Sequence, residues 1–293
     1  MRRRALAAAI AVILAAALTA FVAPGVAAAG DRATLLAASL TGGREVPGPG
    51  DPDGSGRAFV RLDGDRACFL LQWSRISAPT ASHIHVGRRG VAGPVVVLFF
   101  QGQLPDTLNA VAGCAPADPA VVKAVAANPR DYYVNIHTAD FPDGAIRGQL
   151  HRARHLDLDV PDQLTARLRG ANEVPPADPD GHGQAFVDTG RTRVCFAVAW
   201  ANIGAPIFAH IHQGVAGVNG PVVVLFFDVP EPTAGAPPAA LPDTITAAAG
   251  CIGGQDAALL RDIRRHPGAY YVNVHTGEFP GGAIRGQLRR LGH

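Results

Sequence analysis

Short apolar runs, separated by clusters of glycine, proline and aspartate, make up most of the hydrophobic pattern of this chain. Runs of this length that are rich in Val, Phe and Ile are typical of β-strands. In the first half they predict seven strands, at residues 34–40, 57–62, 67–73, 82–85, 94–100, 132–137 and 145–150. The run from Val95 to Phe100 (VVVLFF) is apolar at every position, which favours a central strand buried on both faces.

A helical pattern is clear in one segment of each half, at Asp118–Pro129 and at Gln255–His266. Several short strands at a spacing of about 8–12 residues favour an antiparallel β-sandwich. The pattern therefore predicts an all-β protein. We expect two tandem antiparallel β-sandwich domains of Greek-key-like topology, each with one short helix.

Two copies of the same pattern lie in the chain. The stretch ASHIHVGRRGVAGPVVVLFF around His83 returns as FAHIHQGVAGVNGPVVVLFF around His210, and YYVNIHTADFPDGAIRGQL returns as YYVNVHTGEFPGGAIRGQL. A repeat of this length predicts one folded unit per copy. We expect domains at residues 30–151 and 163–293 with a linker at 152–162. An insertion in the second copy, near residues 229–242 and rich in Pro and Ala, is expected to form a surface loop.

The first residues resemble an export signal. MRRR precedes an apolar run and the small residues VAAAG, which predicts a signal peptide at residues 1–29 and a secreted, extracytoplasmic mature chain. No later run reaches the roughly 18 apolar residues of a spanning helix, so we expect no membrane span in the mature chain. The formal net charge is only +2 and the sequence carries no basic stripe, which argues against nucleic acid as a partner.

The four cysteines occur at matching positions, two in each copy. In an exported protein this arrangement predicts one disulfide per domain, Cys68–Cys114 and Cys195–Cys251. A thiolate metal site is the alternative, and the wide spacing of the cysteines argues against it.

Polar residues that both copies retain are expected to cluster. Residues two apart on a strand share one face, so His83 and His85 point to the same side. If the strands are neighbours, one cluster contains His83, His85, His137, Asn135 and Arg147, and the other contains His210, His212, His275, Asn273 and Arg285. The carboxylates of Glu45 and Glu173, in the repeated EVP motif, are expected to pair with the arginines or to reach the histidines, and the alternative is that they lie in a turn in contact with solvent.

Two interpretations of these clusters remain open. Three imidazoles could bind copper or zinc with a fourth position open to water, and such a site could serve a redox role. Alternatively, the clusters could be hydrogen-bonded networks that support the fold. The sequence favours the structural interpretation, since no acidic or cysteine ligand is repeated nearby. It contains no repeated Gly-flanked serine and no repeated pair of acids, so no catalytic residue is assigned and an enzyme is not the favoured class.

The motifs LTGGREVP and LRGANEVP, HIHxG, GPVVVLFF and YVNxHT…FPxGAIRGQL resemble the CHRD domain, the module named from chordin, in two tandem copies. The resemblance covers nearly the whole chain after residue 29 and implies an extracellular, β-rich module. We therefore expect a secreted tandem CHRD protein that acts as an extracellular binding or structural module with an unidentified ligand. A copper- or zinc-binding protein with one three-histidine site per domain is the alternative.

Overall fold

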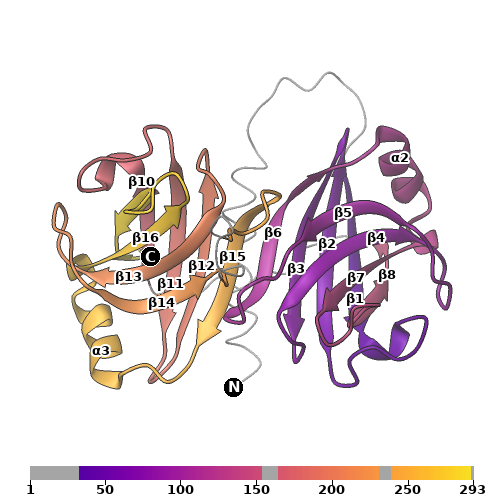
Figure 1. The fold of residues 1–293 in the computed structure, drawn as a ribbon, viewed down its shortest axis with the longest axis horizontal. Helices are drawn as coiled ribbons and strands as arrows, with labels where there is room; N and C mark the ends of the chain where they lie inside the picture. Colours follow the sequence, from indigo (N-terminus) through magenta and orange to yellow (C-terminus); the bar gives the residue numbers. More distant parts are fainter. Residues whose placement is uncertain (1–32, 154–163, 231–238, 292–293) are drawn as a thin grey trace. The chain divides into compact units, whose positions relative to one another are not determined.

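The computed structural model describes residues 33–153, 164–230 and 239–291, which form two compact units (Figure 1). The boundary between the units lies within residues 154–163. The expected signal peptide, almost all of the expected linker and the centre of the expected insertion lie outside the described residues. No helix in the described part of the chain is long and apolar enough to cross a membrane.

The first unit is built almost entirely from strands. They are β1 (Thr34–Thr41), β2 (Ser55–Asp63), β3 (Arg66–Ser74), β4 (Pro79–Val86), β5 (Val95–Gln101), β6 (Leu108–Pro116), β7 (Tyr132–Thr138), β8 (Ile146–Gln149) and β9 (His151–Arg152). Helix α2 (Pro119–Ala127) and the single-turn helices η1 (Gly42–Arg44) and η2 (Pro129–Asp131) connect them. The side chain of Asp118 caps α2 by accepting a hydrogen bond from the Ala120 amide.

The strands form two antiparallel sheets packed face to face. One sheet has the order β6-β3-β2-β1, and the other has the order β5-β4-β7-β8. The chain crosses between them at the end of β8, because β9 leaves the second sheet and pairs with β1 in the first. The expected antiparallel β-sandwich is therefore confirmed.

The second unit repeats this arrangement. Its elements are β10 (Leu164–Arg169), η3 (Gly170–Asn172), β11 (His182–Thr189), β12 (Val194–Ala201), β13 (Pro206–Gln213), β14 (Val222–Asp228), β15 (Ile245–Ile252), α3 (Ala257–Arg265), η4 (Pro267–Ala269), β16 (Tyr270–Thr276), β17 (Ile284–Gln287) and β18 (Arg289–Arg290). Its sheets have the orders β15-β12-β11-β10 and β14-β13-β16-β17, and β18 pairs with β10.

Alternating apolar residues fill the space between the two sheets of each unit. In the first unit Leu36, Val60, Ile84 and Val134 are inaccessible to solvent. Aromatic rings connect the layers, since Phe69 of β3 lies 4.8 Å from Phe99 of β5 between ring centroids. The polar residues between these apolar positions face outward, which places the retained histidines on the outer face of the second sheet.

The prediction of a central, fully buried strand at Val95–Phe100 is wrong. Strand β5 ends the order of its sheet, and the side chains of Val95 and Leu98 are 48% and 45% exposed. Two irregularities in the β4–β5 pairing, at Ser82/His83 and Ile84/His85, turn these side chains to the outer face. An apolar residue at every position therefore did not mean that both faces were covered.

Besides the two-residue β9, the sequence missed β6 of the first unit, whose equivalent in the second unit is β15. These segments are rich in alanine and contain glycine, so their intrinsic β-propensity is low. Their pairing with β3 and β12 is what makes them strands, and it sets Cys68 opposite Cys114 and Cys195 opposite Cys251. Both expected disulfides are present, Cys68–Cys114 and Cys195–Cys251.

Candidate metal centre

The retained polar residues meet on the outer face of one sheet in each unit. In the first unit β4 lies between β5 and β7, and His83 is directly opposite Asn135, which is in turn opposite Arg147 of β8. The next pair on the same face of β4 and β7 is His85 and Tyr133. Opposed residues of paired strands share a face, so the tertiary structure brings the predicted cluster together.

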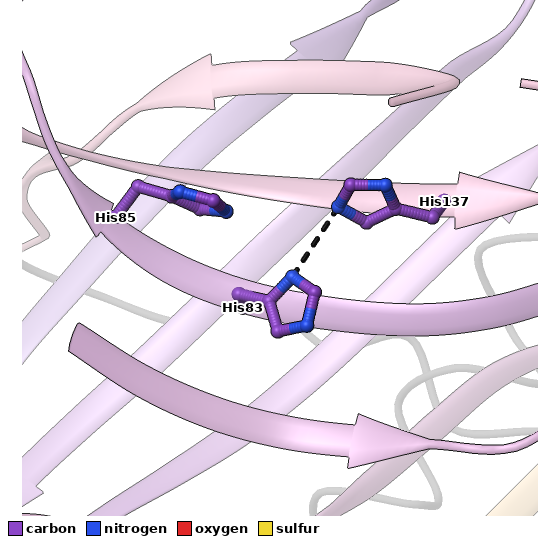
Figure 2. A group of neighbouring side chains, drawn as sticks. All are labelled: His83, His85 and His137. Atoms are coloured by element: carbon purple, nitrogen blue, oxygen red, sulfur yellow. Dashed lines mark hydrogen bonds between the residues drawn. The ribbon is translucent and has the colours of Figure 1, made fainter. Parts of the chain in front are cut away.

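Three imidazoles of the first unit form a compact group (Figure 2). His83 and His85 come from β4 and His137 comes from β7, and one ring nitrogen of each lies within 4.8 Å of the others. The Nδ1 atom of His83 is 3.2 Å from the Nε2 atom of His137. All three side chains are partly exposed, so the group is reachable from solvent.

The second unit has the same group in a more buried form. His210 and His212 of β13 and His275 of β16 again place one ring nitrogen each within 4.8 Å of the others. His210 and His275 are each only 5% exposed. Among the described residues, no hydrogen-bond partner exists for the buried atoms His210 Nδ1, His212 Nε2 and His275 Nε2. Each histidine of this group therefore keeps a ring nitrogen without a partner.

Backbone carbonyls determine which nitrogen carries the proton. The Nδ1 atom of His85 donates to the Gly93 carbonyl at 2.8 Å, and the Nδ1 atom of His137 donates to the Pro142 carbonyl at 2.8 Å. In the second unit His212 and His275 donate in the same way to Gly220 and Pro280 at 2.7 and 3.0 Å. Because a carbonyl oxygen can only accept, Nε2 of each ring is left with its lone pair.

The repeated GP and FPxG motifs supply these carbonyls. A Cβ atom on Gly93 would lie 1.6 Å from the Val86 carbonyl oxygen, so this close approach requires glycine. The proline carbonyls come from the turns that follow β7 and β16. Sequence reasoning missed this outer layer of hydrogen bonds, although the repeated motifs were a signal for it.

Burial keeps the histidines neutral near pH 7. Desolvation and the neighbouring imidazoles lower the pKa of His83 to about 4 and that of His210 to about 3. Desolvation also lowers the pKa of His275 to about 4. Neutral imidazole is the form that binds a metal ion.

A second group of polar residues lies beside the histidines. The ring of Tyr133 stacks on His85 at 4.8 Å between centroids, and the guanidinium carbon of Arg147 lies 3.3 Å from the centre of the Tyr133 ring. Arg147 donates to the carbonyls of Arg88 and Val91, which fixes the loop between β4 and β5. The second unit repeats this arrangement. The ring of Tyr271 stacks on His212, and the guanidinium of Arg285 lies over the Tyr271 ring.

Glu45 and Glu173 are buried next to these arginines and not in a solvated turn. Glu173 Oε2 lies 3.9 Å from Arg285 Nε, and the Glu45 carboxylate is close enough to Arg147 for the positive charge to lower its pKa. Desolvation outweighs this effect and raises the pKa of each carboxyl to about 7. Gly144 is required beside Glu45, since its φ is +135° and an added Cβ would lie 2.5 Å from the Glu45 carboxyl carbon.

The raised pKa of Glu173 predicts a stability that falls as pH rises. Between pH 4.5 and about 7 the folded chain holds a proton that the unfolded chain releases, so higher pH favours unfolding. Glu173→Gln removes this contribution. Urea titration measures the free energy of unfolding of the wild type and of Glu173→Gln at each pH. We expect the wild-type value to decrease relative to the variant value as the pH rises from 4.5 to 8. A constant difference over this range would show that Glu173 titrates normally.

One difference between the two groups is the residue opposite the third histidine. Phe208 of β13 stacks on His275 at 4.2 Å between ring centroids, whereas its counterpart on β4, opposite His137, is Ala81. The aromatic ring explains why the histidines of the second unit are the more buried ones.

A comparison with known protein families agrees with the division into two units. The CHRD domain family matches residues 36–150 and 164–288, which are the two sandwiches described above. No curated protein matches the chain.

Proposed function

Since the chain belongs to the CHRD family, with two tandem domains, we propose that it is an extracytoplasmic module that binds copper or zinc at one three-histidine site per domain. The export-like first residues and the two disulfides support a location outside the cytoplasm. The binding sites would be His83, His85 and His137 in the first domain, and His210, His212 and His275 in the second.

The three unpartnered ring nitrogens of the second domain are the observation that carries the proposal. A buried polar atom without a partner costs about 1–3 kcal/mol, and each of the three histidines of this group has one. A purely structural network would be expected to pair them. Two of the three histidines in each domain also donate Nδ1–H to a backbone carbonyl, which is the usual support of a metal-binding imidazole.

The donor set fits copper or zinc in particular. Imidazole is a good ligand for both ions, and three imidazoles leave a further position for water or another small ligand. Three nitrogens bound to one zinc ion are about 3.3 Å apart in tetrahedral geometry. The ring nitrogens already lie within 4.8 Å of one another, so small side-chain movements would bring them to this distance. Bound metal would supply a Lewis acid or, with copper, a redox centre.

Metal binding predicts a stabilisation that depends on both sites. We expect untagged, chelator-treated protein to bind two equivalents of copper or zinc per chain. We also expect the ion to raise the melting temperature, because a ligand present at 100 times its Kd stabilises by about 2.7 kcal/mol. His85→Ala should reduce the stoichiometry to one, and His85→Ala with His212→Ala should abolish it.

The matched control is His182→Ala, since His182 is exposed and has no counterpart in the first domain. This variant should still bind two ions. If neither ion binds or shifts the wild-type melting temperature, the clusters are structural networks. His85→Ala would then destabilise the metal-free protein by about 1–3 kcal/mol and do nothing else.

A further inference from the structure

Arginines that are scattered along the sequence of the first domain converge on two adjoining pockets. One pocket has a volume of about 520 Å³ and contains Arg88, Arg130 and Arg152, and the other, of about 300 Å³, contains Arg44, Arg89 and Arg147. His151 lines both, so the two pockets are neighbours, and together they are called the arginine groove below. Asp131 is the single carboxylate among the lining residues.

Most of this positive charge is not neutralised by the protein. Asp131 pairs with Arg88 at 2.7 Å, and Arg147 is buried and bound to backbone carbonyls. Within the described part of the chain, the side chains of Arg89 and Arg130 are exposed, and neither guanidinium makes a hydrogen bond or ion pair. Several like charges that face one cavity create a strong positive potential, which attracts anions.

The second domain shows that the framework does not require these arginines. Gln149 Nε2 donates to the carbonyls of Gly87 and Arg130, and Gln287 Nε2 donates to those of Gly214 and Gly268. The same two loops are therefore joined in both domains. The positions of Arg44, Arg88, Arg89 and Arg130 are taken in the second domain by Asn172, Val215, Ala216 and Gly268.

We propose that the arginine groove binds a small organic or inorganic compound with two or more phosphate or sulfate groups. The combined volume is that of a small-molecule site and not of an extended polymer track. Guanidinium groups match tetrahedral oxyanions through paired N–H donors, so the arginines of the groove are suited to phosphate or sulfate groups. Arg89 and Arg130, with their donors unused, would make the decisive contacts.

Calorimetric titration of the metal-free, full-length protein tests this proposal, with tripolyphosphate and a trisulfated disaccharide as probes. We expect one molecule bound per chain and an affinity that falls with added salt. Arg89→Ala combined with Arg130→Ala should weaken binding at least tenfold, because it removes two guanidinium groups that would make charge-assisted hydrogen bonds to the anion. The matched control is Arg57→Ala with Arg66→Ala, two exposed arginines on β2 and β3 outside the groove.

The two probes distinguish the source of the anion. Tighter binding of tripolyphosphate assigns a phosphorylated ligand, and tighter binding of the disaccharide assigns a sulfated one. The proposal is overturned if neither probe binds, or if the Arg57/Arg66 variant loses as much affinity as the Arg89/Arg130 variant. It is also overturned if a 12-base-pair DNA duplex binds more tightly than both probes, because the ligand would then be a nucleic acid.

Discussion

Cys68→Ala combined with Cys114→Ala should lower the stability of the first domain by about 4 kcal/mol. The disulfide joins residues 46 apart in sequence, and opening a loop of this length restores conformational entropy to the unfolded chain. Because these cysteines lie opposite each other on β3 and β6, the bond also holds a low-propensity strand in its sheet. Cys195→Ala with Cys251→Ala, across a separation of 56 residues, should have a similar effect on the second domain.

Tryptophan fluorescence can follow each domain separately. Trp73 and Trp200 are the two tryptophans of the chain, and each is buried in its own domain. In a Trp200→Phe background, the urea midpoint reported by Trp73 should fall when Cys68 and Cys114 are replaced. In a Trp73→Phe background, the midpoint reported by Trp200 should stay the same. Equal shifts of both signals would mean that the two domains unfold as one unit.

Arg147→Met should destabilise the first domain by about 3–5 kcal/mol at pH 8. Methionine preserves much of the apolar volume, but it leaves the buried Glu45 carboxylate without its countercharge and two loop carbonyls without a donor. The loss should be smaller at pH 5, since Glu45, with a pKa raised to about 7, is then protonated and carries no charge. Urea denaturation at the two pH values measures both effects.

A double-mutant cycle separates the charge from the packing. Adding Glu45→Gln to Arg147→Met should restore part of the lost stability at pH 8, because it removes the unpaired charge. Arg57→Met, at an exposed position, should change stability by no more than about 0.5 kcal/mol. If Glu45→Gln restores nothing, the cost of Arg147→Met comes from the loop carbonyls and not from Glu45.

The sequence alone predicted the sandwich because its strands follow the rule of alternating burial. Along β7, Val134 and Ile136 face the core, and the alternate residues Tyr133, Asn135 and His137 lie on the face of the histidine cluster, as the pattern required. The internal repeat then identified His83, His85 and His137 as a group. Their strands had only to be neighbours for the cluster to form, and the pairing of β4 with β7 meets this condition.

Other features depended on contacts between distant segments. The position of β5 at a sheet edge, and β6 as a strand at all, follow from pairing partners that local composition does not encode. Hydrogen bonds to the carbonyls of Gly93 and Pro142 decide which ring nitrogen of His85 and His137 keeps its lone pair. The directions of these carbonyls depend on the turns that contain them. Arg44, Arg89 and Arg130 are far apart in the chain, so no basic stripe could reveal that they line one groove.

The sequence by itself thus determined the repeat, the all-β class, the disulfide partners and the membership of the histidine clusters. These properties depend on local periodicity and on comparison of one copy with the other, both of which can be read along the chain. Only the tertiary structure decided which strand is an edge, which ring nitrogens lack a partner, and where the positive charge of the first domain accumulates. Burial and electrostatic potential depend on everything packed around a group, and most of those neighbours are remote in sequence.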